Sequence, residues 1–180
     1  LASVVQFRFM SQLFENMGVG GGMATAFQAF SFVFVLAGPF VVWILFAGLF
    51  QGISLVFDGD GDFSSTLAHV GWGFVPSLFG SAANVLINYY RFNVRGMDVP
   101  ADMNPQAMQE FMQSMQTDPL VALTATLGIV FTLWSAFLWT FGLKHARNIT
   151  VKQAAITVAL PVVIGTLIHG RSLLVALEVL

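Results

Sequence analysis

The sequence predicts an all-α, polytopic transmembrane helical bundle with one interfacial amphipathic helix. Most apolar residues lie in four stretches without Asp, Glu, Lys or Arg, residues 16–57, 63–90, 119–143 and 153–170. A helix that crosses the hydrocarbon core needs about 20 mainly apolar residues, and none of these stretches alternates as a barrel strand would. Hydrophobic residues make up 57% of the chain and charged residues only 9%, whereas soluble domains carry about a quarter charged residues.

Four spans are expected within a single domain over residues 1–180. We predict them at about residues 27–50, 63–89, 119–143 and 153–169, with any further helix restarting after Gly170. Glycines at 20–22 predict a flexible break before the first span, because glycine destabilises a helix interior. Pro39 predicts a kink inside that span, since proline removes a backbone hydrogen bond.

Two amphipathic segments are predicted to lie on the membrane surface. The first covers residues 1–17, where apolar and polar side chains alternate at short intervals. The second begins at Asn104 as N-cap and Pro105 as first helical residue. Its apolar stripe consists of Met108, Phe111, Met112 and Met115. We expect this stripe to face lipid or the bundle. The alternative is that it forms a docking groove for partners.

Small residues in the second span predict close helix packing. Gly73, Ser77 and Ser81 recur every four residues, which places them on one face of a helix, and small residues let membrane helices approach closely. The predicted packing and motif residues of this span are Gly71, Trp72, Gly73, Pro76, Ser77 and Gly80.

The sequence offers little support for catalysis, cofactors or metals. Asp58, Asp60 and Asp62 lack the glycine and the glutamate that a calcium loop needs at its sixth and twelfth positions, so a solvated turn is expected. Ser81 and His169 supply the residue types of a serine protease but not the surrounding motif. We therefore predict no enzyme, no cofactor and no metal site.

Charge and cysteine content narrow the possible partners. The formal net charge is −2 with only 7 lysines and arginines, too few for a nucleic-acid surface. Cysteine is absent, so no disulfide framework or thiolate chemistry is available. Thr150 and Gln153 have the spacing of a capping box at the start of the last span.

Two groups of short motifs resemble the Yip family of polytopic membrane proteins. The first is the acidic turn at 58–62 followed by Phe63, Thr66, Leu67 and the segment 71–76. The second comprises Trp134, Trp139, the segment 142–144, Thr150 and the segment 152–155.

The resemblance implies a bundle of five membrane helices with a cytosolic N-terminus. The four visible spans would be its second to fifth, and the first would lie upstream of Leu1. Eukaryotic members engage small Rab-type GTPases through an N-terminal Asp-Leu-Tyr-Gly signature, which this chain lacks. The prokaryotic branch is therefore the nearer likeness, and a GTPase partner is not expected.

Two functions remain open from the sequence. The first is a non-enzymatic scaffold or adaptor in the cell membrane, with lipids and other integral membrane proteins or a second copy as partners. The second is a transporter or channel subunit, because Pro39, Pro76 and Pro161 interrupt three spans and broken helices often line substrate paths.

Overall fold

The computed structural model describes residues 21–96 and 104–177, and these residues contain no strand. The predicted surface segment at 1–17 lies outside the described residues. The chain divides into two compact units, residues 1–44 and 45–180. The second unit holds most of the helices and all of the contacts discussed below.

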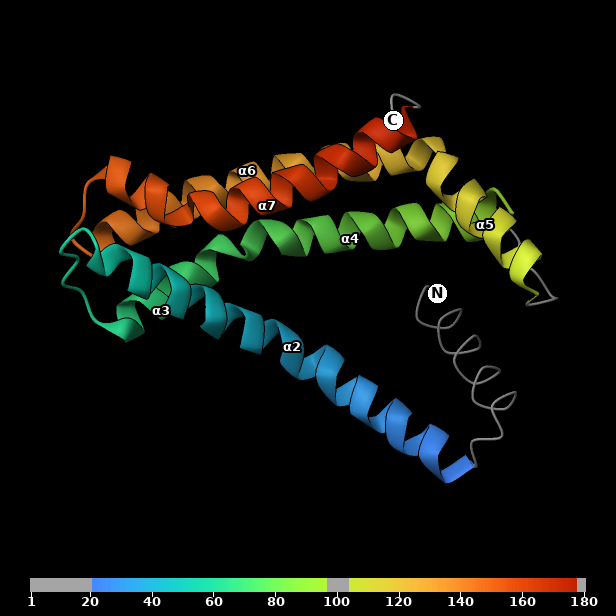
Figure 1. Cartoon of the computed structure of the whole chain (residues 1–180), viewed down its shortest axis with the longest axis horizontal. Helices are drawn as coiled ribbons and strands as arrows, with labels where there is room; N and C mark the ends of the chain where they lie inside the picture. The colour runs from blue at the N-terminus through green and yellow to red at the C-terminus, as the bar shows by residue number, and fades with distance from the viewer. Residues whose placement is uncertain (1–20, 97–103, 178–180) are drawn as a thin grey trace. The chain divides into compact units, whose positions relative to one another are not determined.

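Six α-helices and one π-helical turn make up the described residues (Figure 1). In chain order they are α2 (Gly21–Leu55), α3 (Phe63–Gly73), α4 (Val75–Tyr89), η1 (Tyr90–Val94), α5 (Pro105–Thr117), α6 (Pro119–Ala146) and α7 (Val151–Ala176).

The prediction of a polytopic helical bundle is confirmed. Four segments are long and apolar enough to cross a membrane, with mean hydropathies of 1.9, 1.4, 1.9 and 1.8 in chain order. They are Leu36–Leu55, Phe63–Val94, Pro119–Ala146 and Val151–Ala176. The protein is therefore a multi-pass membrane protein.

Helix α2 is longer at both ends than the span predicted within it. Helix α2 already includes Gly21 and Gly22, continues through Pro39 and ends at Leu55. The predicted span at about residues 27–50 lies within this helix. The helix continues past residue 50 to Leu55, and in its last turn Ser54 donates its hydroxyl to the Gln51 carbonyl at 2.7 Å.

The last span is longer than predicted. Helix α7 continues through Pro161 and Gly170 to Ala176, without the expected restart. Its N-terminus agrees with the prediction, because Thr150 and Gln153 form the capping box. Of the three prolines proposed to interrupt spans, only Pro76 coincides with a break between described helices.

The second span is broken at Phe74. Helix α3 ends at Gly73, α4 begins at Val75, and Pro76 occupies the first turn of α4. Proline has no backbone N–H and clashes with the preceding turn, so an uninterrupted helix would be strained here. The Phe74 N–H bonds the Gly71 carbonyl at 3.0 Å instead of the Val70 carbonyl.

Helix α6 is the central element of the second unit. It packs against α7, α3 and α4, and α7 and α4 run beside it in Figure 1. Two contacts between glycine and a larger side chain set the helix spacing. A Cβ added at Gly128 of α6 would lie 2.5 Å from the His169 ring of α7, and one at Gly80 of α4 would lie 3.1 Å from Phe131.

Arg147 joins the loop after α2 to the loop after α6. Its side chain is 1% exposed, and its Nε donates to the Ser54 hydroxyl at 2.8 Å. Its Nη2 donates to the Gly59 carbonyl, and its own carbonyl accepts from the Asp60 N–H at 3.3 Å. The acidic turn is therefore fixed to the helical bundle through a buried guanidinium.

We expect Arg147→Met to destabilise the fold, because the buried Gly59 carbonyl would lose its partner. An unsatisfied buried polar group costs about 1–3 kcal/mol, and more when its partner was charged. The melting temperature in detergent should fall by roughly 5 °C or more, on a scale of about 2–4 °C per kcal/mol for a chain of this length. Lys152→Met, at an exposed cation in the first turn of α7, should melt like the parent. Equal melting of both variants would contradict the proposed role of Arg147.

Candidate functional site

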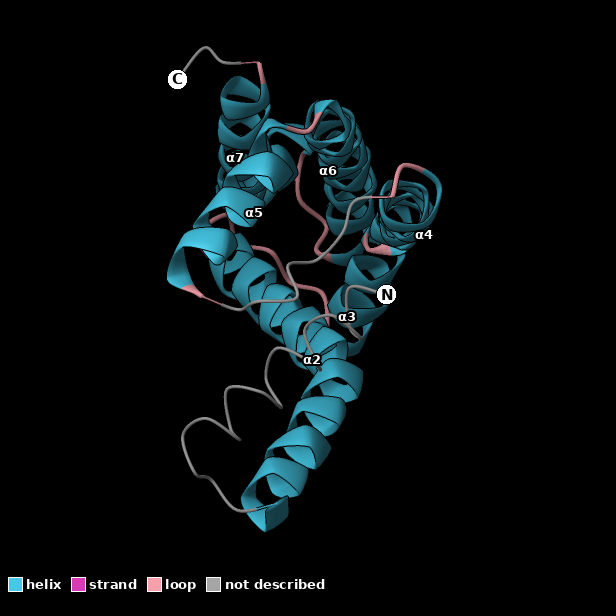
Figure 2. Cartoon of the chain, turned by 90° about the vertical axis from the view of Figure 1, so that its right-hand side faces the viewer, coloured by secondary structure: helices cyan, strands magenta, loops and turns pink. Residues whose placement is uncertain are grey.

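An open groove runs between α4, α6 and α7, with a volume of about 450 Å³. Figure 2 views the protein from the α5 end and shows how these three helices are arranged. We call this feature the polar groove, because many of its lining side chains carry hydroxyl, amide or imidazole groups. These include Ser77, Ser81, Asn84, Thr124, Thr132, Ser135, His169 and Ser172.

The α4 wall of the polar groove carries polar side chains that bond mainly to their own helix. Ser81 donates to the Ser77 carbonyl at 2.9 Å, and Asn84 donates to the Gly80 carbonyl at 3.0 Å. No described residue donates to the side-chain oxygen of Asn84, which lies on an exposed part of α4. An amide that faces lipid without a full set of partners is costly, so this wall is suited to a polar contact with another helix.

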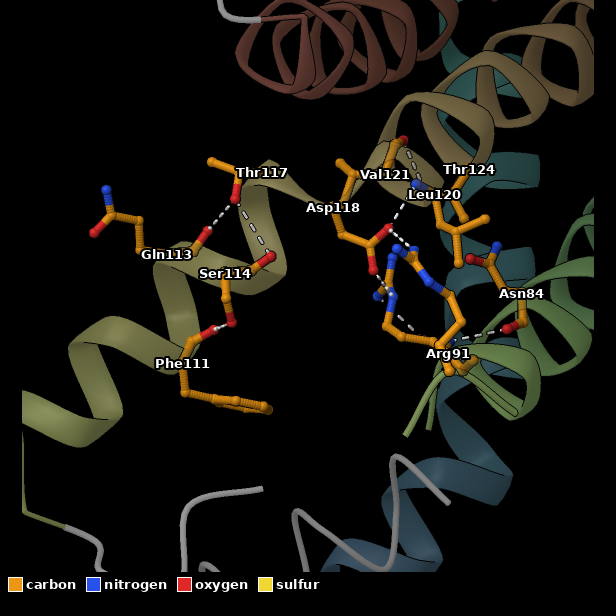
Figure 3. Close-up of polar contacts among 12 residues, drawn as sticks. Asn84, Arg91, Phe111, Gln113, Ser114, Thr117, Asp118, Leu120, Val121 and Thr124 are labelled. Carbon is orange, nitrogen blue, oxygen red and sulfur yellow. Dashed lines mark hydrogen bonds and ion pairs between the residues drawn. The ribbon is translucent and has the colours of Figure 1, made fainter. Parts of the chain in front are cut away.

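A chain of polar contacts leads from the groove to the α5 end of the bundle (Figure 3). The Asn88 amide donates to the Asn84 carbonyl at 2.9 Å, and Arg91 Nη1 reaches Asn88 Oδ1 at 3.5 Å. Arg91 Nε lies 3.0 Å from Asp118 Oδ2, while Arg95 Nη1 lies 3.1 Å from Asp118 Oδ1. One carboxylate thus serves two arginines.

Asp118 also begins helix α6. Its Oδ1 accepts the Leu120 N–H at 2.8 Å, which caps the helix N-terminus. The Asp118 side chain is 2% exposed and that of Arg91 is 6% exposed, so this ion pair is shielded from solvent. Removing one partner of a shielded ion pair strongly destabilises a protein, because the other charge stays buried without a partner. The Asp118 carboxylate therefore fixes the end of α4 and η1 to the start of α6.

Trp139 of α6 lines the polar groove at its other end. Its indole N–H donates to the Val70 carbonyl at 2.9 Å, the carbonyl that the helix break at Phe74 leaves without its usual partner. The ring packs against Phe46 and Phe74 with centroid distances of 5.5 Å and 5.3 Å. A Cβ at Gly73 would lie only 1.9 Å from this ring.

The predicted packing residues of the second span have different surroundings. Gly73 and Pro76 are buried, whereas Ser77 is exposed and lines the polar groove. Trp72 is 72% exposed, and Gly71 provides the carbonyl that ends α3. The seam predicted from Gly73, Ser77 and Ser81 is therefore divided, because the break at Phe74 separates Gly73 from the helix that carries both serines.

The predicted amphipathic helix forms as α5, and Asn104 caps it by accepting the Ala107 N–H at 2.8 Å. Its apolar stripe is only partly covered by the rest of the chain. Met108, Phe111 and Met115 are half-buried, and Met112 is 52% exposed.

The acidic turn is held by hydrogen bonds within the protein. Asp62 caps α3 by accepting the Ser65 N–H at 2.6 Å, and Asp60 accepts from the Asn148 amide at 2.8 Å. Nowhere in residues 21–96 and 104–177 do three or more His, Asp or Glu side chains form a group that could hold a metal ion.

Sequence reasoning missed the roles of Arg147 and Asp118. Arg147 lies in a basic loop that gave no sign of burial, because its partners Ser54 and Gly59 are far away in the sequence. Asp118 left a usable signal, since an Asp directly before Pro119 is typical of an N-cap followed by a first helical residue. Its two arginine partners could not be read from the sequence.

Comparison with known proteins gives one family. The sequence model of the Yip1 domain family matches residues 1–170. An uncharacterized protein of the archaeon Methanocaldococcus jannaschii is 40% identical over 53 residues, which are 29% of this chain and 38% of the relative. The chain thus aligns with less than half of that relative's length. No solved structure matches.

We expect Gly73→Leu to lower the melting temperature in detergent, because even a Cβ at this position would overlap the Trp139 ring. Overpacking costs typically about 1–3 kcal/mol. Gly48→Leu is the matched control, since nothing lies within 4 Å of a Cβ at that exposed position. If both variants melted like the parent, the contact between α3 and α6 would not be close.

Proposed function

Because the chain belongs to the Yip1 domain family, we propose that it is a non-enzymatic scaffold or adaptor that organises other integral membrane proteins. We place it in the cell membrane of a prokaryote. The observation that carries this proposal is the polar groove, which opens between spanning helices and offers hydroxyl and amide groups along α4.

The occupant proposed for the groove is a transmembrane helix of another membrane protein. Ser77, Ser81 and Asn84 lie along one wall, and Gly80 between them lets α4 approach Phe131 of α6. Small and hydroxyl-bearing side chains let helices approach, and amides form hydrogen bonds between helices in lipid. The side-chain oxygen of Asn84 needs a donor, which a polar residue of the entering helix would supply.

The described helices give the transporter alternative less support than the sequence did. Helices α2 and α7 pass through Pro39 and Pro161 without interruption. The remaining break at Phe74 is filled by the Trp139 indole, which bonds the freed Val70 carbonyl. A broken helix that exposes carbonyls to a substrate path would leave such groups available; here the carbonyl is already occupied.

We expect a photoreactive benzophenone side chain at position 84 to cross-link, in native membranes, to the spanning segment of another integral membrane protein. The same group at position 85, where Val85 is 68% exposed, should yield mainly lipid adducts. Mass spectrometry of the joined peptides identifies the partner. Co-purification of that partner should then be lost in Asn84→Leu and retained in Val85→Leu, since only the first variant removes the amide.

Three results would contradict this proposal. Lipid adducts alone at position 84 would mean that the groove faces lipid. Cross-links to residues 1–20 of the same chain, or to a second copy, would mean that the groove is filled by this chain itself. Sustained solute movement by the purified protein in proteoliposomes would replace the scaffold with a transporter.

A further inference from the structure

A second open cavity lies beside the polar groove, at the α5 end of the bundle. Its volume is about 370 Å³, and residues from α5, α6 and α7 line it. They are Gln116, Val121, Ile168, Arg171, Ser172 and Val175. The cavity therefore combines one cation and one amide with an apolar wall.

The polar groups of this cavity are available to a ligand. Arg171 and Gln116 are both exposed, and neither side chain has a hydrogen bond or ion pair within the described part of the chain. Ser172 donates its hydroxyl to the Ile168 carbonyl at 3.1 Å, which leaves its oxygen only as an acceptor. Arg171 and Gln116 thus supply the free donors, and a guanidinium binds phosphate oxygens in a bidentate manner.

Arg171 is the one charged side chain among the described residues that line this cavity. Asp118 is already shared between Arg91 and Arg95, and the buried Arg91 Nη2 has no hydrogen-bond partner. None of the described residues that line the cavity carries a carboxylate that could neutralise Arg171.

The apolar wall indicates where the ligand comes from. The candidate span of α7 ends at Ala176, so Arg171 lies within about 8 Å of that end at 1.5 Å per residue. Arginine at this depth extends its charged head to the membrane interface. Ile168 is 60% exposed and Leu167 is 67% exposed, and at three and four residues before Arg171 they share its helix face and offer an apolar surface to an acyl chain.

We propose that this cavity binds the headgroup of an anionic phospholipid, with Arg171 and Gln116 contacting the phosphate oxygens. The proposal is independent of the scaffold function, because it involves a lipid and a different cavity. A free phosphate ion would satisfy Arg171 equally well, but it would leave the apolar wall uncovered.

The test measures the melting temperature of the purified protein in detergent with added lipid. Phosphatidylglycerol should raise it more than phosphatidylcholine with the same acyl chains, and inorganic phosphate at the same concentration should not raise it. In Arg171→Gln the extra rise should fall by at least half, whereas Arg171→Lys should keep most of it. Lys152→Gln is the matched control, an exposed cation at the other end of α7, and should keep the full rise.

The melting temperature in phosphatidylcholine checks that each variant is folded. If Arg171→Gln melts at a lower temperature than the parent there, native mass spectrometry counts the phosphatidylglycerol molecules that each variant retains. The proposal would be overturned if Arg171→Gln kept the full rise and the full number of bound lipids. It would also be overturned if inorganic phosphate reproduced the effect of phosphatidylglycerol.

Discussion

The hydrogen bond from the Trp139 indole to the Val70 carbonyl is the interaction on which the rest of the bundle depends. Pro76 breaks the second span at Phe74, and the break frees a backbone carbonyl in a segment of membrane-spanning length. An unsatisfied carbonyl in lipid costs several kcal/mol, so a donor from a neighbouring helix is required. Trp139 supplies that donor, and its ring requires glycine at position 73 because a side chain there would overlap it.

This arrangement also explains why a polar groove exists beside α4. The break changes the face that the second span presents, so Gly73 packs on α6 while Ser77 and Asn84 remain exposed. At the other end of α4, the pair of Arg91 with Asp118 holds η1 against the start of α6. The groove lies between these two fixed points and is completed by α7, whose His169 packs directly on Gly128. The hydrogen bond of Trp139 and the ion pair of Arg91 therefore determine the shape of the proposed partner site.

The fold class could be predicted because hydrophobic length is a local property. Span number, the Asn104 cap and the capping box of Thr150 with Gln153 were all confirmed. Helix ends were less predictable, since α2 and α7 continue through Pro39 and Gly170, which local rules treat as breakers. The buried guanidinium of Arg147 and the shared carboxylate of Asp118 were not predictable, because their partners are fixed by packing between segments distant in sequence.

The most direct test of this account is a distance measurement between spin labels at positions 85 on α4 and 130 on α6, both exposed in this cysteine-free chain. Trp139→Phe keeps an aromatic ring but removes the donor to Val70, so the distance distribution in lipid bilayers should broaden markedly. Trp134→Phe, on the same helix and stacked on Phe79 at 5.8 Å, should leave the distribution as in the parent. Identical distributions in the parent and Trp139→Phe would contradict the claim that this hydrogen bond fixes the broken span to α6.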